Sequence, residues 1–326
     1  MPVGGMMKPL IKVDRLKKYY AQDRSIVRSV DDISLEIQAG ETLGLVGESG
    51  CGKSTVARCL MHLTDITSGS IEFDGQPIEE FSRKELKRYR REAGMIFQDP
   101  YASLNPRRTA RDLIAEPLEI HRILRGDAKE KRIYDLLELV GLPKQSSSRF
   151  PHEFSGGQRQ RIGIARALAA DPRFIICDEP ISALDVSVQA QIINLLKKLQ
   201  KEMGLTYLFI AHDLRIVKYL STHVAVMYLG QIMEMAPTKE LFDNPQHPYT
   251  KALLSAIPIP DPEAERTRQR IELKGEVPSP MNSPKGCPFA TRCAHATPQC
   301  HHVRPKLREV AKGHKAACHL LPVLKD

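Results

Sequence analysis

Short runs of apolar residues recur along this chain and indicate β-strands. Apolar and polar side chains alternate over residues 30–37, and Ile71 and Phe73 continue the alternation before a predicted turn at Asp74-Gly75. Five further runs are apolar or rich in β-branched and aromatic residues, which is typical of buried strands. These runs are residues 42–46, 93–97, 174–177, 206–210 and 223–227.

Helical periodicity separates several of these runs. The apolar positions of residues 133–140 fall at i, i+3, i+4 and i+7, and those of residues 192–199 repeat this spacing. A third helix is predicted for residues 55–63, directly after a glycine-rich loop. Because strands alternate with helices along the chain, we expect an α/β fold with a largely parallel sheet.

The character of the sequence changes at Asp243. Prolines recur from Pro245 to Pro284 and interrupt any long helix or strand. Four of the seven cysteines also fall near the end of the chain, whereas the other three are scattered through its first part. We therefore expect a boundary at residue 243.

Composition narrows the possible functions. The 326 residues, 42% of them hydrophobic, are enough to bury a large core. No run of 18 apolar residues occurs, so we predict no membrane-spanning helix and expect a soluble, cytoplasmic chain. The net charge of +9 arises from 48 basic and 39 acidic residues, a modest bias that would also suit nucleic acid or an anionic membrane surface.

Residues 47–54 read Gly-Glu-Ser-Gly-Cys-Gly-Lys-Ser and match the phosphate-binding P-loop pattern G-x-x-x-x-G-K-[ST]. Its glycines let backbone N–H groups surround phosphate oxygens. We expect Lys53 to reach the β and γ phosphates and Ser54 to bind Mg²⁺ at the positive end of the following helix. The residues expected to contact ATP are Gly47, Ser49, Gly50, Cys51, Gly52, Lys53, Ser54 and Thr55.

Two carboxylates, Asp178 and Glu179, follow the apolar run 174–177. Open α/β sheets bind ligands at the carboxyl ends of their strands. We expect Asp178 to support Mg²⁺ and Glu179 to polarise the attacking water as a general base. A lone Asp-Glu pair after a strand is more often a solvated turn, but the P-loop upstream favours the catalytic interpretation.

A glycine-rich run lies between the P-loop and the acidic strand, and it reads Phe154-Ser155-Gly156-Gly157-Gln158. In this order the three motifs resemble the nucleotide-binding subunit of an ABC transporter. The resemblance implies a P-loop NTPase (RecA-like) core with an antiparallel β subdomain and an α-helical signature subdomain at about residues 99–158. It implies an ATPase domain over residues 1–242 and a small Cys- and Pro-rich extension over residues 243–326.

The resemblance also assigns roles to single residues. Gln98 resembles the Q-loop glutamine that contacts Mg²⁺ and water, and His212 resembles the switch histidine that contacts the γ phosphate. Asp185 belongs to a sequence that resembles the D-loop. Tyr20 resembles the aromatic residue that stacks on adenine, with Tyr19 as its competitor. In this family the signature, which matches residues 154–158 here, closes over the ATP of a partner subunit. The alternative interpretation of residues 154–158 is a turn that caps the following helix.

Three local stretches narrow the resemblance to the ATP-binding subunits of oligopeptide and dipeptide importers, including nickel-importing relatives. They are residues 97–106, 244–250 and 275–280. The resemblance implies a homologous ATPase partner in a heterodimer, two membrane-spanning permeases and an extracytoplasmic peptide-binding protein. ATP would close a head-to-tail dimer at the cytoplasmic face of the membrane, and hydrolysis would reopen it. Peptide length, and peptide versus nickel as cargo, stay open.

Cys287, Cys293, Cys300 and Cys318 are separated by five, six and seventeen residues. Four thiolates suit Zn²⁺ or an iron–sulfur cluster, but the chain has no C-x-x-C pair, and buried inert thiols are the alternative. Importers of this type carry a similar pattern, and some bind a [4Fe–4S] cluster there. The resemblance therefore favours a [4Fe–4S] cluster over zinc.

Two other function classes compete with the importer. A soluble ABC protein that acts on nucleic acid would use the positive charge, and an iron–sulfur scaffold would carry a vestigial nucleotide site. The intact set of Lys53, Gln98, Glu179 and His212 favours an ATPase over the scaffold. We expect no nucleic-acid partner, because the positive charge is spread over a mixed surface.

Overall fold

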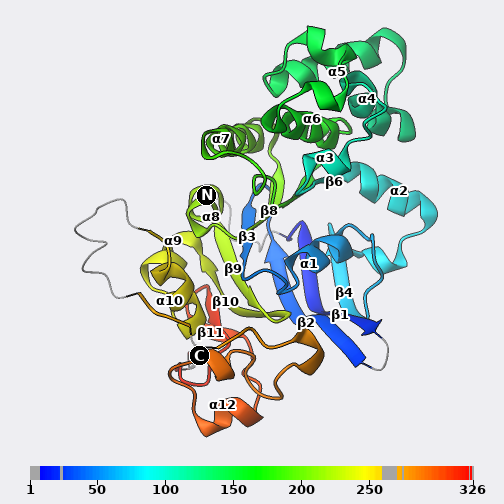
Figure 1. Ribbon diagram of the computed structural model, residues 1–326. Helices are drawn as coiled ribbons and strands as arrows, with labels where there is room; N and C mark the ends of the chain where they lie inside the picture. Colours follow the sequence, from blue (N-terminus) through cyan, green and yellow to red (C-terminus); the bar gives the residue numbers. More distant parts are fainter. Residues whose placement is uncertain (1–7, 23–24, 259–269, 274, 323, 325–326) are drawn as a thin grey trace, which may run out of the picture. The chain divides into compact units, whose positions relative to one another are not determined.

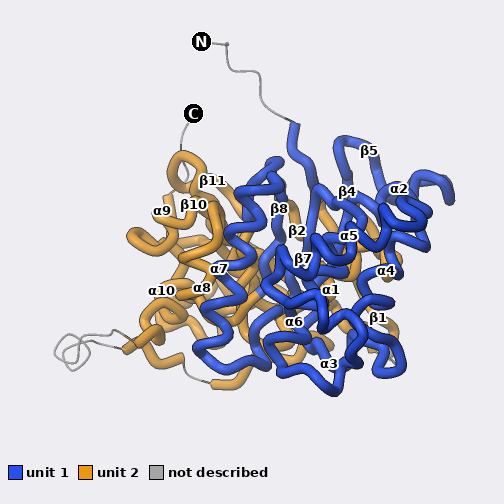
Figure 2. Tube along the Cα trace, turned by 90° about the horizontal axis from the view of Figure 1, so that it is seen from above, with its two compact units in different colours: residues 1–12, 36–42, 72–210 blue, residues 13–35, 43–71, 211–326 orange. Residues whose placement is uncertain are grey.

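The computed structural model describes residues 8–22, 25–258, 270–273, 275–322 and 324 (Figure 1). Residue contacts divide the chain into two compact units that alternate along the sequence (Figure 2). Unit 1 holds residues 1–12, 36–42 and 72–210, and unit 2 holds residues 13–35, 43–71 and 211–326. An element that crosses a boundary is described with the unit that holds most of its residues.

Unit 1 is built on three parallel strands. β6 (Ala93–Ile96) pairs with β7 (Phe174–Asp178), and β7 pairs with β8 (Thr206–Ala211), with Ala93 and Thr206 on either side of Phe174. All residues of β7 and β8 are buried, as expected for uniformly apolar strands of a parallel sheet. The short strand β5 (Gln76–Pro77) pairs antiparallel with Glu72 and Phe73.

Helices α4, α5 and α6 of unit 1 pack on one another, and α6 also contacts α3, α7 and β6 (Figure 1). The apolar residues of α5 that sequence periodicity singles out, such as Leu136 and Leu137, are fully buried. The helices and 3₁₀ turns are η1 (Ile78–Glu80), α2 (Arg83–Glu92), α3 (Pro100–Ser103), α4 (Ala110–Ile120), α5 (Gly126–Leu139), η2 (Lys144–Ser148), η3 (Pro151–Glu153), α6 (Gly156–Leu168) and α7 (Val186–Met203).

Unit 2 contains five paired strands in the order β11-β12-β10-β9-β3. β3 (Thr42–Val46) runs parallel to β9 (His223–Tyr228), and β10 (Gln231–Pro237) is antiparallel to β9. β12 (His314–Ala316) pairs antiparallel with both β10 and β11 (Arg308–Ala311). The last part of the chain therefore adds two strands to the sheet that carries β3, and the sequence patterns did not predict them.

A second group of strands in unit 2 has the order β2-β1-β4. These strands are β1 (Ile11–Gln22), β2 (Ser25–Ile37) and β4 (Ser68–Phe73). The helices and 3₁₀ turns of unit 2 are α1 (Lys53–Leu60), α8 (Leu214–Leu220), α9 (Thr238–Asp243), α10 (Pro248–Ser255), η4 (Pro280–Asn282), η5 (Ala290–Arg292) and α12 (Pro298–His302).

The predicted strands and helices are present. The five apolar strands begin at the expected residues and end within one residue of the expected bounds, whereas β2, α5 and α7 begin five to seven residues earlier than predicted and α1 ends three residues earlier. Among the described residues after 243, no helix or strand is longer than the eight residues of α10. Among the described residues, no helix combines the length and apolar character needed to cross a membrane.

Candidate nucleotide-binding site

The P-loop connects β3 to α1 in unit 2. Gly52 has a φ of +107°, and a Cβ atom at this position would lie 2.1 Å from the carbonyl oxygen of Ser29. Only glycine fits there, because any side chain would collide with the backbone of β2. Helix α1 begins at Lys53, two residues before its predicted start, so that its first N–H groups, which have no carbonyl partner within the helix, lie at the end of the loop.

Lys53 points back into the loop. Its side chain is 5% exposed, and its ammonium group donates hydrogen bonds to the carbonyl oxygens of Gly47 at 2.8 Å and Glu48 at 3.1 Å. Phosphate oxygens are stronger partners for an ammonium group than carbonyls, so the phosphate contact predicted for Lys53 requires only the exchange of these two hydrogen bonds. Burial raises the pKa of the neighbouring Cys51 thiol, and Lys53 only partly opposes this effect. Cys51 is therefore a neutral loop residue.

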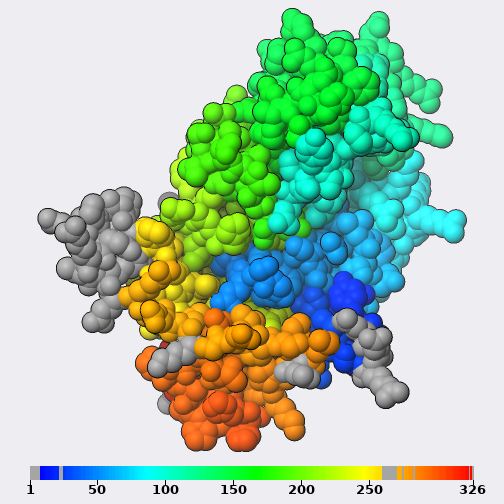
Figure 3. All heavy atoms as spheres, in the orientation of Figure 1, coloured from blue at the N-terminus to red at the C-terminus, as the bar shows by residue number. Residues whose placement is uncertain are grey.

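Glu48 of the P-loop forms hydrogen bonds with two residues of the last third of the chain. Its backbone N–H donates to the hydroxyl of Tyr249 at 3.1 Å, and its carboxylate accepts two hydrogen bonds from Nη1 of Arg292, at 3.0 and 2.8 Å. Figure 3 shows the medium-blue spheres of the P-loop region beside the orange spheres of residues 275–322, named the C-terminal segment below. The sequence patterns did not predict Tyr249 and Arg292 as partners of the P-loop.

Tyr19 and Tyr20 differ in their surroundings. The Tyr19 hydroxyl donates a 2.5 Å hydrogen bond to Asp31, which also accepts one from Arg304 at 2.6 Å. Burial and this bond to Asp31 raise the pKa of Tyr19 to about 12. Asp31 is itself buried, which opposes its charge, but Tyr19 and Arg304 together lower its pKa. Tyr20 is 36% exposed and has Nζ of Lys18 4.8 Å from its ring centroid.

The predicted catalytic residues of unit 1 meet at the carboxyl ends of β6 and β7. Gln98 Nε2 donates a 3.1 Å hydrogen bond to the Glu179 carboxylate, and Asp178 is buried at the end of β7. Glu179 has a φ of +45°, in the left-handed region that side chains other than glycine rarely adopt. Its N–H donates to the carbonyl of Ile210 at 3.0 Å, and this contact holds the unusual backbone in place.

The signature forms the start of α6. Ser155 accepts a hydrogen bond from the N–H of Gln158, whose side chain accepts one from the N–H of Ser155, so the two residues make a capping box. Gly157 is buried, and a Cβ atom there would lie 2.4 Å from Val188 of α7. Asp185 is exposed at the N-cap position of α7, and its side chain makes no capping bond.

The predicted site residues are divided between the two units. Tyr20, the P-loop and the exposed His212 belong to unit 2, whereas Gln98, Asp178, Glu179, the signature and Asp185 belong to unit 1. Each unit therefore carries one part of the nucleotide motifs. The division follows from the position of each motif in the sequence. Residues 72–210 belong to unit 1, and the P-loop lies before this range and His212 after it.

The residues of the Asn244–Thr250 run surround a buried acid. Glu234 of β10 accepts hydrogen bonds from the backbone N–H groups of Gln246 at 2.6 Å and His247 at 2.9 Å. Its carboxylate also contacts Nε2 of the fully buried His314 at 2.7 Å. Burial opposes the charge of Glu234, but these partners lower its pKa. Glu234 thus joins both the run and the C-terminal segment to β10.

The four late cysteines lie near one another. Cys287, Cys300 and Cys318 are buried, and the backbone N–H of Cys287 donates to the carbonyl of Cys300 at 2.7 Å. Burial raises the pKa of Cys287 to about 12, and the charges of the other three thiols contribute to that rise. In the part of the chain that the structure describes, no group of three or more Cys, His, Asp or Glu side chains is arranged to hold a metal ion.

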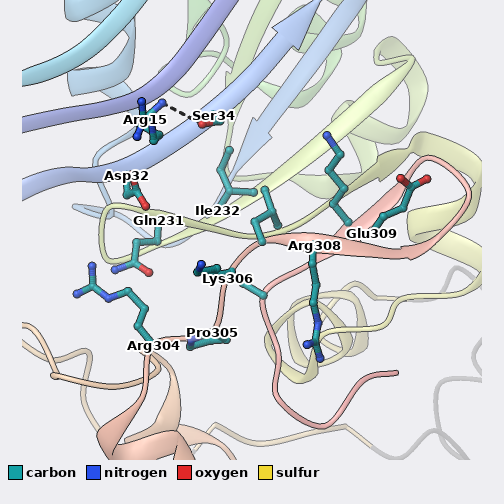
Figure 4. Close-up of a pocket in the computed structure, with 13 residues that line it drawn as sticks. Arg15, Asp32, Ser34, Gln231, Ile232, Arg304, Pro305, Lys306, Arg308 and Glu309 are labelled. Carbon is teal, nitrogen blue, oxygen red and sulfur yellow. Dashed lines mark hydrogen bonds between the residues drawn. The ribbon is translucent and has the colours of Figure 1, made fainter. Parts of the chain in front are cut away.

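A separate pocket of about 690 Å³ opens in unit 2 (Figure 4). Basic residues outnumber acidic ones in its lining, and the N–H of Arg15 donates to Ser34 at 2.9 Å on its wall. None of the described residues that line it belongs to the predicted nucleotide site. The basic lining residues are Arg15, Arg304, Lys306, Arg308 and Lys315, and the acidic ones are Asp32 and Glu309.

Comparison with known proteins identifies both parts of the chain. A family described as ABC transporter matches residues 30–182, and a family described as the C-terminal region of oligopeptide/dipeptide transporters matches residues 233–300. The chain is 58% identical to the oligopeptide transport ATP-binding protein OppF of Bacillus subtilis, over 81% of this chain and 88% of the relative. It is 53% identical to AppF of the same organism, over 90% of each.

Solved structures agree with this result. The chain matches the dimeric, post-hydrolysis structure of the ATP-binding cassette MJ0796 bound to ADP and Pi, with a TM-score of 0.65 and 30% identity. The match covers 70% of this chain and 98% of MJ0796. The expected α/β fold of a P-loop ATPase is thereby confirmed.

Proposed function

The chain belongs to the ABC transporter ATP-binding proteins, in the branch that serves oligopeptide transport, and from this we propose that it is an ATP-hydrolysing subunit that powers uptake of di- or oligopeptides across the cytoplasmic membrane. The observation that carries this proposal is the joint presence of a P-loop with a buried Lys53 and a Gln98–Glu179 contact behind a parallel strand. The P-loop supplies a cradle for the phosphates, and the Gln98–Glu179 pair supplies a base for the attacking water, which are two requirements of phosphoryl transfer.

The residues of the site divide the chemistry between them. Lys53 and the backbone N–H groups of the P-loop bind the ATP phosphates. The hydroxyl of Ser54 and the side-chain oxygens of Asp178 and Gln98 are hard oxygen donors of the kind that suit Mg²⁺, which neutralises charge on the phosphates when bound. Glu179 orients and polarises the attacking water, and His212 contacts the γ phosphate.

We infer that Tyr20, and not Tyr19, stacks on adenine. The Tyr19 hydroxyl is bound to the buried carboxylate of Asp31, which fixes the ring for a structural purpose. Tyr20 is more exposed and has no such bond among the interactions described. Its exposed ring offers the aromatic surface that a base requires for stacking.

The signature and the D-loop serve a second ATPase subunit in this proposal. The capping box of Ser155 and Gln158 fixes the start of α6, where unpaired N–H groups favour an anion such as the phosphates of a partner's ATP. Asp185 is exposed at the start of α7 and is available to a partner. ATP closes the head-to-tail dimer, and hydrolysis lets it reopen. We propose a homologous, non-identical ATPase as the partner.

Two permeases and an extracytoplasmic binding protein complete the proposed importer, with this chain at the cytoplasmic face of the membrane. Phe97 is 40% exposed and Tyr101 is 57% exposed, and both flank Gln98 in the stretch that is expected to face permease helices. Exposed aromatic residues beside a catalytic glutamine suit a contact that transmits motion. Nickel import is the alternative, and no observation favours it over peptides.

Reconstitution tests this function. Mild detergent extraction should co-purify this chain with two permeases and a second ATPase, and proteoliposomes of that complex should take up labelled peptide only with ATP and binding protein. Lys53→Ala should abolish uptake, while the matched change Lys306→Ala at an exposed position should not. Uptake of nickel without peptide, or purification with nucleic acid in a salt-sensitive complex, would refute peptide import.

We also propose that Cys287, Cys293, Cys300 and Cys318 bind a [4Fe–4S] cluster, with zinc as the alternative metal. Four thiols match in number the donor set that such a cluster uses, and Cys287 and Cys300 are joined by a backbone hydrogen bond, although the described side chains are not arranged around one metal position. A cluster would hold together a proline-rich segment that has few regular elements. Iron and sulfide should be present in about a 1:1 ratio in protein purified without oxygen. Replacing all four cysteines with serine should remove both, whereas zinc without iron would contradict the cluster.

A further inference from the structure

Glu48 occupies a position of the P-loop pattern that can hold any residue, yet it makes hydrogen bonds through three groups. Its N–H donates to Tyr249, its carbonyl accepts from Lys53, and its carboxylate accepts from Arg292. The P-loop pattern needs none of these contacts for a turn. A negative charge beside a phosphate site also repels ATP unless a cation neutralises it. The partner of the Glu48 carboxylate therefore matters for nucleotide binding.

Arg292 is that partner. It ends η5 in the C-terminal segment, between Cys287 and Cys293, and its side chain is only 9% exposed. Its Nη1 atom donates to both carboxylate oxygens of Glu48, at 3.0 and 2.8 Å, and to the hydroxyl of Tyr228 at 3.5 Å. The pair is therefore a partly desolvated ion pair, and removing one partner would leave the other as an uncompensated charge.

Aromatic packing fixes the backbone that carries Arg292. The ring of Phe289 lies 5.5 Å from that of Tyr228 and 5.3 Å from that of Tyr249, in edge-to-face and tilted arrangements. Tyr249 is the residue whose hydroxyl contacts the N–H of Glu48. The same cluster thus supports the P-loop through a neutral hydrogen bond and through an ion pair.

We propose that Arg292 is a positioning residue for the nucleotide site. It neutralises the Glu48 carboxylate and holds the P-loop in the conformation that accepts phosphate, so that ATP affinity depends on the folded C-terminal segment. The proposal rests on the ATPase function proposed above and adds a role for a residue outside every nucleotide motif. A second contact of the C-terminal segment supports this proposal. Arg304 donates a hydrogen bond to Asp31, and Asp31 accepts one from Tyr19, the neighbour of the proposed adenine-stacking residue Tyr20.

ATP binding to the full chain tests the proposal. Arg292→Ala should raise the Kd for ATP about tenfold, which corresponds to about 1.4 kcal/mol. Arg292→Lys keeps the charge and should recover part of that loss. In the complex with permeases, KM for ATP should rise in Arg292→Ala while kcat at saturating ATP stays within about twofold, because the hydrogen bonds of Arg292 go to Glu48 and Tyr228 and not to a predicted catalytic residue.

Two controls separate positioning from general damage. Lys306→Ala removes one positive charge from the same segment at an exposed position and should leave the Kd unchanged. In the Glu48→Gln background, Arg292→Ala should cost less than half as much as in the wild-type chain, because the charge it neutralises is gone. An equal loss in both backgrounds would overturn the proposed pairing.

Hydrogen exchange gives a readout that needs no ATP. The amides of residues 47–54 should exchange about tenfold faster in Arg292→Ala than in the wild-type chain, while those of β7 in unit 1 should not change. Unchanged P-loop exchange together with an unchanged Kd would overturn the inference. Failure of the wild-type chain to bind ATP would instead refute the proposed function, and the exchange experiment would still decide the role of Arg292.

Discussion

The side-chain amide of Gln98 donates a hydrogen bond to the carboxylate of Glu179 across 3.1 Å, although 81 positions separate the two residues. Gln98 follows β6 and Glu179 follows β7, and the parallel pairing of these strands brings both residues to the same edge of the sheet in unit 1. An amide and a carboxylate in contact can hold one water between them and the substrate. Substitution of Glu179 is therefore the most direct test of the proposed chemistry.

Glu179→Gln should lower the ATP turnover of the complex by at least about 100-fold, because general-base contributions are of that order or larger. The Kd for ATP should stay within about threefold of wild type, since Lys53 and the P-loop provide the phosphate contacts. The exposed residue Glu138 offers a matched control, and Glu138→Gln should change neither quantity. Full turnover in Glu179→Gln would exclude this residue as the base.

Gly52→Ala should disrupt the P-loop more than Gly50→Ala. Both glycines have positive φ, at +107° and +77°, so both changes carry backbone strain of about 1–2 kcal/mol. Only at Gly52 would the new Cβ collide with the carbonyl of Ser29, whereas at Gly50 it meets open space. We expect loss of detectable ATP binding in Gly52→Ala and retained binding in Gly50→Ala, measured by titration calorimetry. Equal behaviour of the two variants would contradict the described loop.

Tyr20→Ala should weaken ATP binding by about tenfold, because loss of base stacking costs about 1–3 kcal/mol. Tyr20→Phe keeps the ring and should bind as wild type. Tyr19→Phe removes the hydrogen bond to Asp31 and should lower the free energy of unfolding by about 1 kcal/mol with a smaller effect on Kd. The opposite ranking of the Kd values would assign adenine stacking to Tyr19.

His247 should make the stability of unit 2 depend on pH. Burial lowers the pKa of His247 to about 4, against a weaker opposing effect of Glu234. Below pH 6.5 the unfolded chain binds a proton at this residue that the folded chain does not, so stability is lost as the pH falls from 6.5 towards 4. The full loss from this group is of the order of 3 kcal/mol.

Urea unfolding at several pH values checks this prediction. His247→Gln should show a flatter decline in the free energy of unfolding between pH 6.5 and 4.5 than the wild-type chain. His152→Gln, at an exposed position, should follow the wild-type curve. A wild-type slope in the His247→Gln variant would mean that acidic groups alone determine the decline.

Local patterns predicted the elements that carry the motifs. The uniformly apolar run ending at Asp178 became the buried strand β7, and the P-loop lies between a strand and a helix as its pattern requires. The Ser155-to-Gln158 spacing is also a capping-box pattern, which marks the start of α6 at Gly156. These features depend on neighbours within a few residues, so a single sequence contains them.

The contacts between distant segments could not be predicted in the same way. Arg292 and Glu48 lie 244 positions apart, and no local sequence pattern around either residue indicates that the two are in contact. Strands β11 and β12 have four and three residues, too few to establish an alternating pattern. The role of the Asn244–Thr250 run likewise depends on its contact with Glu234 of β10. A charged residue is usually expected at the surface, so the sequence did not indicate that Glu234 is buried.

The pairing of β12 with β10 has a consequence for synthesis of the protein. Glu234 and its partner Ala316 are 82 residues apart in the chain, so at about 5–20 residues per second a ribosome needs roughly 4–16 s to pass from one to the other. During that interval the edge of β10 is open and Glu234 lacks His314. The nascent chain is therefore exposed to mispairing and aggregation at this edge, and chaperone binding there would protect it until β12 is made.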